Sequence, residues 1–366
     1  RLARCLPNVK LVTLCGGVPT APQSATLGFG AHIAVGTPGR ILKHLEQGTL
    51  RLESLRTLVL DEADRMLDMG FGEDIHQVIR FAPRERQTLL FSATYPEGIA
   101  NMSRGVQRQP VEVSVEALHQ ETAIAQQLFE SAPGQRPEAL ARLLSHFQPS
   151  SCVVFCNTKR ACNEVTDYLI GRGFSALALN GDLEQRDRDQ VLVRFANGSA
   201  AILVATDVAA RGLDIKELGA VINYELTYDP EVHVHRIGRT GRAGQQGLAL
   251  SLYQANEAQR VTVIEEYLGS TLPQGDLNSL EASLRPVLPE YATLSIGGGR
   301  KDKLRPGDIL GALTGDGGLS GDQVGKIQVQ DQFAYVAVRR SQAKAALKRL
   351  NDGKIKGRSY RVRLLG

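Results

Sequence analysis

The stretch Thr57-Leu58-Val59-Leu60-Asp61-Glu62-Ala63-Asp64-Arg65-Met66-Leu67 joins a short apolar run to three carboxylates. The apolar run is typical of a buried parallel strand, and the residues after it have the pattern of a helix. Ligands bind at the carboxyl ends of such strands in open α/β sheets. Clustered carboxylates repel one another unless a cation or proton lies among them, and Mg²⁺ bound to nucleotide phosphates is a usual occupant. The stretch therefore predicts a nucleotide site, although acidic residues that merely open a helix would give the same pattern.

In such a nucleotide site the first two carboxylates have separate tasks. Asp61 would hold Mg²⁺ through water, and Glu62 would orient or deprotonate the attacking water. A nucleotide with bound Mg²⁺ is therefore the expected ligand.

Length and composition describe an ordinary soluble globular protein. The 366 residues suggest roughly two or three domains, and 42% are hydrophobic and 22% charged. No run of about 18 apolar residues occurs, so we expect no membrane-spanning helix. The cysteines number five, and Cys152 and Cys156 lie in a strand-like run without a second Cys/His pair nearby. We therefore expect no zinc site, no secretory signal and a cytoplasmic location.

Positive charge is concentrated at the C-terminal end of the chain. Residues 292–366 contain 15 Lys and Arg against 6 Asp and Glu, a net charge of +9 within a whole-chain charge of +4. A compact basic domain beside a mildly acidic body predicts a nucleic-acid-binding module. A solvated basic face is the alternative.

Short apolar runs alternate with amphipathic stretches along two parts of the chain. This alternation predicts two doubly wound parallel sheets, over residues 1–118 and 137–272, joined by a linker at 119–136. A second linker is expected at 273–290, where three prolines occur. The predicted strands are Val9–Leu14, His32–Val35, Leu55–Leu60, Thr88–Phe91 and Val111–Val115 in the first part, and Cys152–Cys156, Ala176–Leu179, Ala201–Ala205 and Ala220–Tyr224 in the second.

Polar residues follow several of these strands. Gly16-Gly17 and Thr37-Pro38-Gly39-Arg40 come after the first two, and the second of these has the features of a helix start. Free N–H groups at a helix start bind phosphate, although a plain cap explains the residues as well. Ser92-Ala93-Thr94 places two hydroxyls at another strand end, where they could bond the carboxylates or serve as a cap.

The segment His233-Val234-His235-Arg236-Ile237-Gly238-Arg239-Thr240-Gly241-Arg242 carries three arginines spaced three residues apart. Such spacing favours guanidinium groups on one face of a short turn or helix. Guanidinium groups suit phosphate oxygens, and an arginine can stabilise the charge of phosphoryl transfer. An exposed basic face is the alternative.

Residues 291–366 predict a separate α+β domain. The expected element order is βαββαβ, which many RNA-binding sheets share. Its elements are Thr293–Ile296, Pro306–Thr314, Gly325–Val329, Tyr335–Val338, Ser341–Asn351 and Ser359–Leu364. The only aromatic candidates for base stacking are Phe333, Tyr335 and Tyr360, so we expect RNA contacts from basic residues instead, namely Arg300, Lys301, Lys303, Lys344 and Lys348.

Taken together, these motifs resemble the DEAD-box family of ATP-dependent RNA helicases, in the family's order over about 270 residues. The matching residues are Thr37-Pro38-Gly39-Arg40, Asp61-Glu62-Ala63-Asp64, Ser92-Ala93-Thr94, Phe155-Cys156-Asn157-Thr158, Gln185 with Arg188, Thr206 to Asp214, and His235 to Arg242. The resemblance implies two RecA-like domains, RNA-stimulated ATP hydrolysis and local separation of RNA strands. The closing domain contains Arg305-Pro306-Gly307-Asp308-Ile309-Leu310-Gly311-Ala312-Leu313 and Lys354-Ile355-Lys356-Gly357-Arg358. With these residues it looks like that of the bacterial DbpA group, which implies docking on a hairpin of large-subunit ribosomal RNA and a role in large ribosomal subunit assembly.

The resemblance also implies roles for individual residues. Asp61 and Glu62 would serve Mg²⁺ and hydrolysis, while Asp214 would contact the ribose. Arg239 and Arg242 would contact the γ-phosphate. Coupling of the two domains would involve Asp64, Ser92, Thr94 and His235, and the RNA track would be lined by Gly17, Thr37, Arg40, Thr158, Gln185, Arg188, Thr206 and Gly212.

One departure from the family concerns ATP. The family's phosphate-binding loop, Gly-x-x-x-x-Gly-Lys-Ser/Thr, does not occur in these 366 residues, and the upstream glutamine and Pro-Thr-Arg-Glu-Leu-Ala motifs are absent as well. We expect that Arg1 reflects an N-terminal truncation; a natural ATP-independent paralogue is the alternative. The competing functions are an RNA-docking module without catalysis and, more weakly, a DNA helicase.

Overall fold

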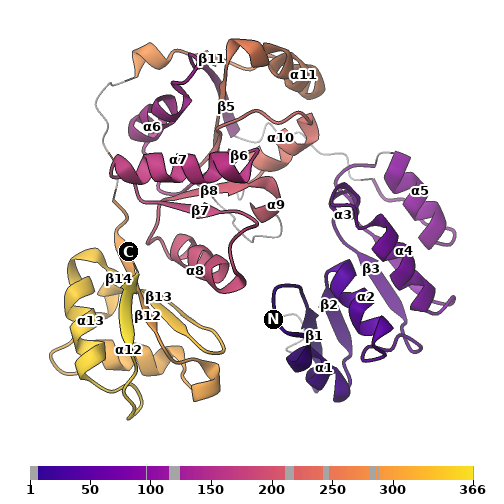
Figure 1. The fold of residues 1–366 in the computed structure, drawn as a ribbon, viewed down its shortest axis with the longest axis horizontal. Coiled ribbons are helices and arrows are strands. Elements are labelled where there is room, and N and C mark those ends of the chain that lie inside the picture. The colour runs from indigo at the N-terminus through magenta and orange to yellow at the C-terminus, as the bar shows by residue number, and fades with distance from the viewer. Residues whose placement is uncertain are drawn as a thin grey trace. The chain divides into compact units, whose positions relative to one another are not determined.

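The computed structural model describes residues 7–95, 97–114, 124–210, 218–241, 247–280, 286 and 288–365 (Figure 1). The chain divides into two compact units, Arg1–Glu116 and Ala117–Gly366. None of the described helices is both long enough and apolar enough to cross a membrane.

The first unit contains two separate pairs of parallel strands. Strand β1 pairs with β2, and β3 pairs with β4. Helices connect the strands, as the alternation of the sequence predicts. The elements are β1 (Leu11–Leu14), α1 (Thr20–Gly28), β2 (Ile33–Gly36), α2 (Pro38–Glu46), β3 (Thr57–Leu60), α3 (Ala63–Asp68), α4 (Gly72–Phe81), β4 (Gln87–Leu90) and α5 (Glu97–Val106).

The strands of the first unit are only partly covered. Leu11, Val35 and Val59 are 54%, 53% and 50% exposed. Apolar packing comes mainly from the helices, because α2 and α4 meet in one cluster with β1, and α3 and α5 meet in another. The strand predicted at Val111–Val115 is not observed in its described part, residues 111–114. A strand needs a neighbour for its backbone hydrogen bonds, and no described strand pairs with this segment.

The second unit begins with a seven-stranded parallel sheet in the order β11-β5-β10-β9-β6-β8-β7. Helices α6 and α7 pack on a cluster formed by the central strands, and α8 belongs to a second cluster. The elements are β5 (Ile124–Glu130), α6 (Arg136–Phe147), β6 (Cys152–Cys156), α7 (Lys159–Gly171), β7 (Ala176–Leu179), α8 (Gln185–Ala196), β8 (Ile202–Thr206), α9 (Asp207–Ala210), β9 (Ala220–Asn223), α10 (Pro230–Ile237), β10 (Gly247–Tyr253), α11 (Ala258–Leu268) and β11 (Gln274–Gly275).

Two predicted linkers contain strands of this sheet. Residues 124–130, inside the predicted linker 119–136, form β5 and pair along their whole length with β10. Residues 274 and 275, inside the predicted linker 273–290, form β11 and pair with β5. Both linker predictions are wrong at these residues, because Gln126 and Gln127 hide the apolar pattern of β5 and β11 is too short to show one.

The C-terminal domain has the βαββαβ order that the sequence predicts. Its four strands form an antiparallel sheet in the order β13-β14-β12-β15, and both helices pack on one face. Leu294 and Ile296 of β12 and Val336 and Val338 of β14 point to these helices, and all four are fully buried. The elements are β12 (Tyr291–Ile296), α12 (Pro306–Thr314), β13 (Val324–Val329), β14 (Ala334–Arg339), α13 (Ala343–Asp352) and β15 (Val362–Leu365).

The opposite face of this sheet is covered by the parallel-sheet domain of the same unit. The hydroxyl of Thr293 donates to Ser199 Oγ at 2.6 Å and accepts from Asn197 Nδ2 at 2.9 Å. The guanidinium of Arg186 on α8 lies 4.5 Å from the centre of the Phe333 ring. Tyr335 is only 2% exposed. This face is therefore an interface between domains, which agrees with the expectation that bases do not stack there.

Candidate functional site

The carboxylates that follow β3 occupy different environments. Asp61 and Glu62 are exposed, whereas Asp64 is 6% exposed. Glu62 adopts the left-handed backbone conformation, with φ 51°, directly before α3. This conformation is uncommon for a residue with a side chain, and such strain concentrates at functional sites. The N–H of Ala63 donates to Phe91 O at 3.0 Å, which fixes the turn against the end of β4.

The structure brings Asp64 together with the two hydroxyls that follow β4. Ser92 Oγ accepts from the backbone N–H of Asp64 at 3.2 Å, and Thr94 Oγ1 donates to Asp64 Oδ2 at 3.3 Å. A shift of Ser92 or Thr94 would therefore move Asp64. His235, which the resemblance assigns to the same coupling group, belongs to the second unit, and its part in coupling stays a prediction.

Three predicted RNA-track residues of the first unit lie at one sheet edge. Gly17 follows β1 with φ 75°, and Thr37 precedes α2 directly after β2. The guanidinium of Arg40 donates to Val18 O at 2.9 Å and to Gln23 Oε1 at 2.8 Å. Thr37 is exposed and its side chain makes no hydrogen bond to cap the helix. The plain-cap alternative thus has no support from the Thr37 hydroxyl.

Predicted RNA-track residues of the second unit lie around the carboxyl ends of β6 and β8, where Cys156 is opposite Thr206. Thr158 Oγ1 accepts from Ala161 N–H at 3.1 Å, so it caps α7. Arg188 donates to Ala209 O at 2.5 Å, and Gln185 donates to Asp189 Oδ1 at 2.7 Å. Thr206 is only 7% exposed. The predicted residues Gly212, Asp214 and Arg242 lie outside the described residues.

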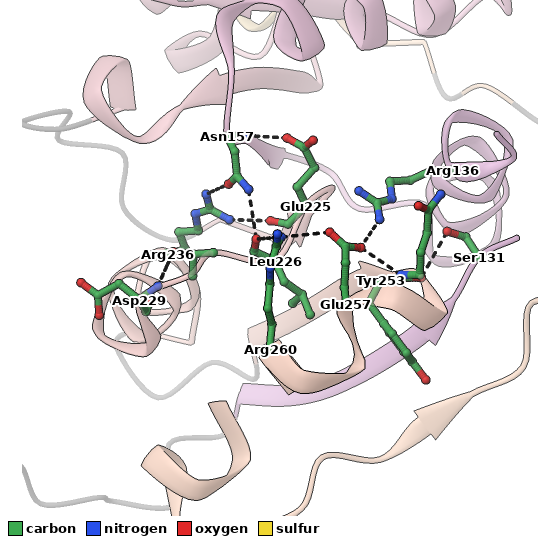
Figure 2. Close-up of polar contacts among 12 residues, drawn as sticks. Ser131, Arg136, Asn157, Glu225, Leu226, Asp229, Arg236, Tyr253, Glu257 and Arg260 are labelled. Carbon is green, nitrogen blue, oxygen red and sulfur yellow. Dashed lines mark hydrogen bonds and ion pairs between the residues drawn. The ribbon is translucent and has the colours of Figure 1, made fainter. Parts of the chain in front are cut away.

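Arg236 is the centre of the polar network of the second unit (Figure 2). Its side chain is 1% exposed and forms a bidentate pair with Asp207, with both distances 2.7 Å. The remaining N–H groups donate to Asn157 Oδ1 at 2.8 Å, Asn223 Oδ1 at 3.2 Å and Glu225 O at 2.8 Å. All five N–H donors of the guanidinium are therefore used within the domain.

This network changes the interpretation of the three evenly spaced arginines. Arg236 points into the domain and has no donor left for phosphate, so the expectation of three guanidinium groups on one phosphate-contacting face is wrong for it. Arg236 instead joins the ends of β6, β8 and β9. A sequence signal that could have revealed this role is the i, i+3, i+4 spacing of His233, Arg236 and Ile237, which places all three on the buried face of α10. Arg239 is half-buried, and its contact with phosphate stays a prediction.

A second ionic cluster lies next to the Arg236 network, and the two share the carbonyl oxygen of Leu226 as an acceptor. Glu257 forms ion pairs with Arg136 and Arg260, and its carboxylate accepts from Gln254 N–H at 3.0 Å (Figure 2). Arg260 also lies 3.7 Å from the centre of the Tyr228 ring. The cluster holds α6 and α11 on β10 and none of its members was singled out from the sequence.

The basic residues predicted to bind RNA in the C-terminal domain are all exposed. Two loops come together at one end of this domain, because Lys356 Nζ donates to Lys303 O at 2.9 Å. Both lysines adopt the left-handed backbone conformation, with φ 60° at Lys303 and 54° at Lys356. The predicted residues divide between these loops and α13, with Arg300, Lys301 and Lys303 in the first group and Lys344 and Lys348 in the second.

Comparisons with known proteins agree with this arrangement. The family models "DEAD/DEAH box helicase", "Helicase conserved C-terminal domain" and "DbpA RNA binding domain" match residues 1–102, 135–244 and 293–364. The ATP-dependent RNA helicase DbpA of Escherichia coli K12 is 58% identical over 365 residues, which cover 100% of this chain and 80% of that protein. The chain belongs to the DbpA group of DEAD-box RNA helicases.

Other members of the family support this assignment. The helicase DbpA of Bacillus subtilis 168 is 36% identical over 97% of this chain and 79% of its own length. The structure of the S. cerevisiae helicase Dbp5 bound to RNA and ADP BeF3 matches with a TM-score of 0.65 and 28% identity, over 74% of this chain and 71% of that chain. The DEAD-box assignment confirms two RecA-like domains, a C-terminal RNA-binding domain, and RNA as the partner.

Proposed function

We propose that this DEAD-box helicase docks on a hairpin of large-subunit ribosomal RNA through its C-terminal domain and acts in assembly of the large ribosomal subunit. The observation that carries the docking is the pair of basic loops joined by Lys303 and Lys356, which remain exposed while the opposite face of the sheet is covered. RNA phosphates are the natural ligands of such lysines. The E. coli and B. subtilis DbpA helicases match nearly all of this chain. This similarity supports the proposal that the chain shares the role of the DbpA group.

The first RecA-like domain would hydrolyse ATP at the edge of β3 and β4. Asp61 is an exposed carboxylate at the carboxyl end of a parallel strand, and this chemistry suits Mg²⁺ held through water. Bound Mg²⁺ would neutralise charge on the phosphates. Glu62, which directly follows Asp61 and is exposed, would orient the attacking water and take its proton.

The remaining site residues would act through contacts that the structure describes in part. Asp64, Ser92 and Thr94 form one hydrogen-bonded group, so they would transmit a change at the phosphates to the second domain together with His235. Arg239 and Arg242 would contact the γ-phosphate and Asp214 the ribose. Gly17, Thr37 and Arg40 would contact the RNA backbone from one domain, and Thr158, Gln185, Arg188, Thr206 and Gly212 from the other.

An RNA-docking module without catalysis is the second candidate. The observation that favours it is the absence of a Gly-x-x-x-x-Gly-Lys-Ser/Thr segment among the 366 residues. Such a loop would cradle the phosphates with its backbone N–H groups.

We further propose a reducing, cytoplasmic location. Cys15, Cys152, Cys156 and Cys162 are all free thiols, and burial raises the pKa of the last three. Free buried thiols are the rule in reducing compartments.

The deciding experiment measures phosphate release from ATP and RNA binding on the same samples. The samples are the 366-residue chain and a chimaera in which the part of the E. coli relative without a counterpart here is added. Each is measured with the ribosomal hairpin RNA, with an unrelated hairpin and without RNA. Turnover that depends on the ribosomal hairpin, and that Glu62→Gln reduces at least about 100-fold without weakening RNA binding, is expected.

The double variant Lys303→Glu with Lys356→Glu tests docking separately. It should weaken binding of the ribosomal hairpin and lower the salt dependence of the remaining binding. Lys326→Glu, an exposed lysine on β13, is the matched control. Equal loss on both hairpins would contradict the docking assignment, and tight hairpin binding without turnover in either protein would favour the non-catalytic module.

A further inference from the structure

Gln23 on α1 is a buried amide whose hydrogen-bonding groups are all used. The residue is 9% exposed. Its Nε2 donates to Thr13 O at 3.3 Å and to Cys15 O at 3.2 Å. Its Oε1 accepts from Arg40 Nη1 at 2.8 Å and lies 3.1 Å from His44 Nε2. A side-chain amide offers two N–H groups and two lone pairs, so Gln23 has no polar group left for a ligand.

The two carbonyl groups that Gln23 binds lie on one side of β1. Leu14 O accepts from Thr37 N–H at 3.1 Å, on the side where β2 pairs. Because carbonyl groups alternate between the two sides of a strand, Thr13 O and Cys15 O point away from β2. Gln23 therefore holds the end of β1 from the side opposite β2.

A buried histidine on α2 fixes the orientation of the Gln23 amide. His44 is 0% exposed, and its Nε2 faces an oxygen that can only accept, so Nε2 carries a proton. Burial, and secondarily the charges of Arg40 and Lys43, lower the pKa of His44, so the ring is neutral at pH 7. Its Nδ1 then accepts from Thr49 Oγ1 at 2.8 Å. These contacts fix the oxygen atom that accepts from Arg40.

Arg40 joins the loops that follow β1 and β2. Its Nη2 donates to Val18 O at 2.9 Å, while its Nη1 donates to Gln23. The two loops approach to backbone contact, because a Cβ added at Gly36 would lie 2.4 Å from Leu14 O. The start of α2 and the turn that contains Val18 are therefore connected through Arg40 and Gln23.

The parts of these loops that are predicted to contact RNA are exposed. Gly17, with φ 75°, and Thr37 both lie at the surface. A Cβ added at Gly16 would meet no atom of the described residues within 4 Å. An RNA strand can therefore approach the backbone of both loops directly. Arg40, by contrast, is half-buried, and both of its terminal nitrogens donate to groups of the protein.

We propose that Gln23, supported by His44, is a positioning residue for RNA binding by the first unit. It sets the direction of Arg40 and, through Arg40, the relative placement of Gly17 and Thr37. Both loops then meet the sugar-phosphate backbone of one RNA strand. Gln23 itself contacts no RNA, because it is buried and its hydrogen bonds are used. This role rests on the proposed contacts of Gly17, Thr37 and Arg40 with RNA.

Binding of a short single-stranded RNA of unrelated sequence by the 366-residue chain tests this role. Fluorescence anisotropy gives the dissociation constant at several salt concentrations. Gln23→Met removes the amide at similar volume and should weaken binding at least about 10-fold, because hydrogen bonds to a charged group are lost. The salt dependence of binding should stay the same, because Gln23 carries no charge and neutralises no phosphate. Gln47→Met, at an exposed glutamine directly after α2, is the matched control and should leave binding unchanged.

A double-mutant cycle separates positioning from a general loss of stability. If Gln23 acts through Arg40, the double variant Gln23→Met with Arg40→Met should bind RNA no more weakly than Arg40→Met alone. Hydrogen exchange without RNA should show a loss of protection at Thr37 N–H in Gln23→Met, while the amides of β3 and β4 keep their rates. His44→Leu leaves the other three bonds of Gln23 in place and should weaken RNA binding by a smaller factor, so it tests the role even if Gln23→Met does not fold.

Unchanged RNA binding by folded Gln23→Met or by His44→Leu, while Arg40→Met weakens it, would overturn the positioning role and leave the proposed RNA track intact. Additive losses in the cycle would also overturn it, because Gln23 would then act independently of Arg40. If Arg40→Met left RNA binding unchanged, the proposed contact of this sheet edge with RNA would be contradicted, and the positioning role with it.

Discussion

The two parallel-sheet regions of the molecule are built from the same kind of sequence but reach different degrees of burial. In the second unit, β6, β8 and β9 each have a strand on both sides, and all of their residues are buried. Among the described residues of the first unit, every strand has a single partner, and no strand is buried throughout. An apolar run thus becomes a fully buried strand only when neighbours exist on both edges.

The two units also differ in how the polar groups at their strand ends are arranged. In the second unit, the five N–H groups of the Arg236 guanidinium donate to oxygen atoms near the ends of three strands. The first unit leaves Asp61 and Glu62 exposed at the corresponding strand end. We therefore expect the second unit to be the more stable and the more sensitive to single substitutions, and the following experiments test that contrast.

The largest effect is expected from Arg236→Met. The substitution leaves Asp207 without its bidentate partner and three carbonyl oxygens without their Arg236 donors, which should lower the free energy of unfolding of the second unit by about 3–5 kcal/mol. Eight of the nine tyrosines lie in the second unit, so tyrosine fluorescence during urea titration measures it. Arg160→Met removes a solvent-exposed pair with Glu164 and should leave the free energy of unfolding essentially unchanged. Equal effects of the two substitutions would contradict the assigned role.

A somewhat smaller effect is expected from core truncation. Leu203→Ala on β8 removes a side chain that is 0% exposed and should lower the free energy of unfolding by about 2–5 kcal/mol. Leu11→Ala on β1 removes a side chain that is 54% exposed and should cost less than about 1 kcal/mol. Hydrogen exchange measures both changes in the free energy of unfolding, from the amides of β8 in the first variant and from those of β1 in the second. If Leu11→Ala proved as costly as Leu203→Ala, the contrast between the units would be lost.

A pH dependence of stability is expected from His233 in the second unit. Burial, and secondarily the charge of Arg236, lower the pKa of His233 to about 4 from its ordinary value of 6.5. The unfolded chain binds the additional proton first, so stability is full above about pH 6.5, falls as the pH decreases toward 4, and levels off below it. The loss should reach about 3 kcal/mol. In the variant His233→Gln this part of the pH dependence should vanish, and an unchanged profile would show that another group causes it.

The smallest effect is expected at the interface with the C-terminal domain. Phe333→Ala removes the ring over which Arg186 lies and should weaken the interface by about 1 kcal/mol. Nuclear magnetic relaxation of the C-terminal domain would show faster independent tumbling. Phe81→Ala, at a 47% exposed position in the first unit, should leave that tumbling unchanged.

Sequence reasoning predicted the fold class and the most regular elements. The apolar run Cys152–Cys156 and the Pro-initiated helix Pro306–Thr314 were predicted with the observed bounds, because period and helix-start signals coincide there. The predictions for residues 111–114 and for β5 were wrong for opposite reasons. The first have a strand pattern without a neighbour, and β5 has two neighbouring strands but a pattern interrupted by glutamines.

In the candidate site, the sequence predicted the contacts between residues that follow the carboxyl ends of neighbouring strands. The grouping of Asp64 with Ser92 and Thr94 is observed, because parallel strands bring their carboxyl ends to one edge. The inward direction of Arg236 could not be predicted, because its partners Asn157, Asp207 and Asn223 come from three distant strands. The functional roles of the site residues stay predictions.

The covered face of the C-terminal sheet has a consequence for domain grafting. An engineer who exchanges this domain for that of another helicase, to redirect the enzyme to a new RNA, transfers a surface that must fit residues outside the grafted part. Arg186, Asn197 and Ser199 would have to be exchanged with it, because they contact Phe333 and Thr293. A graft without them would leave polar groups of the covered sheet face without matching partners. The choice of RNA would then change together with the orientation in which the RNA is held.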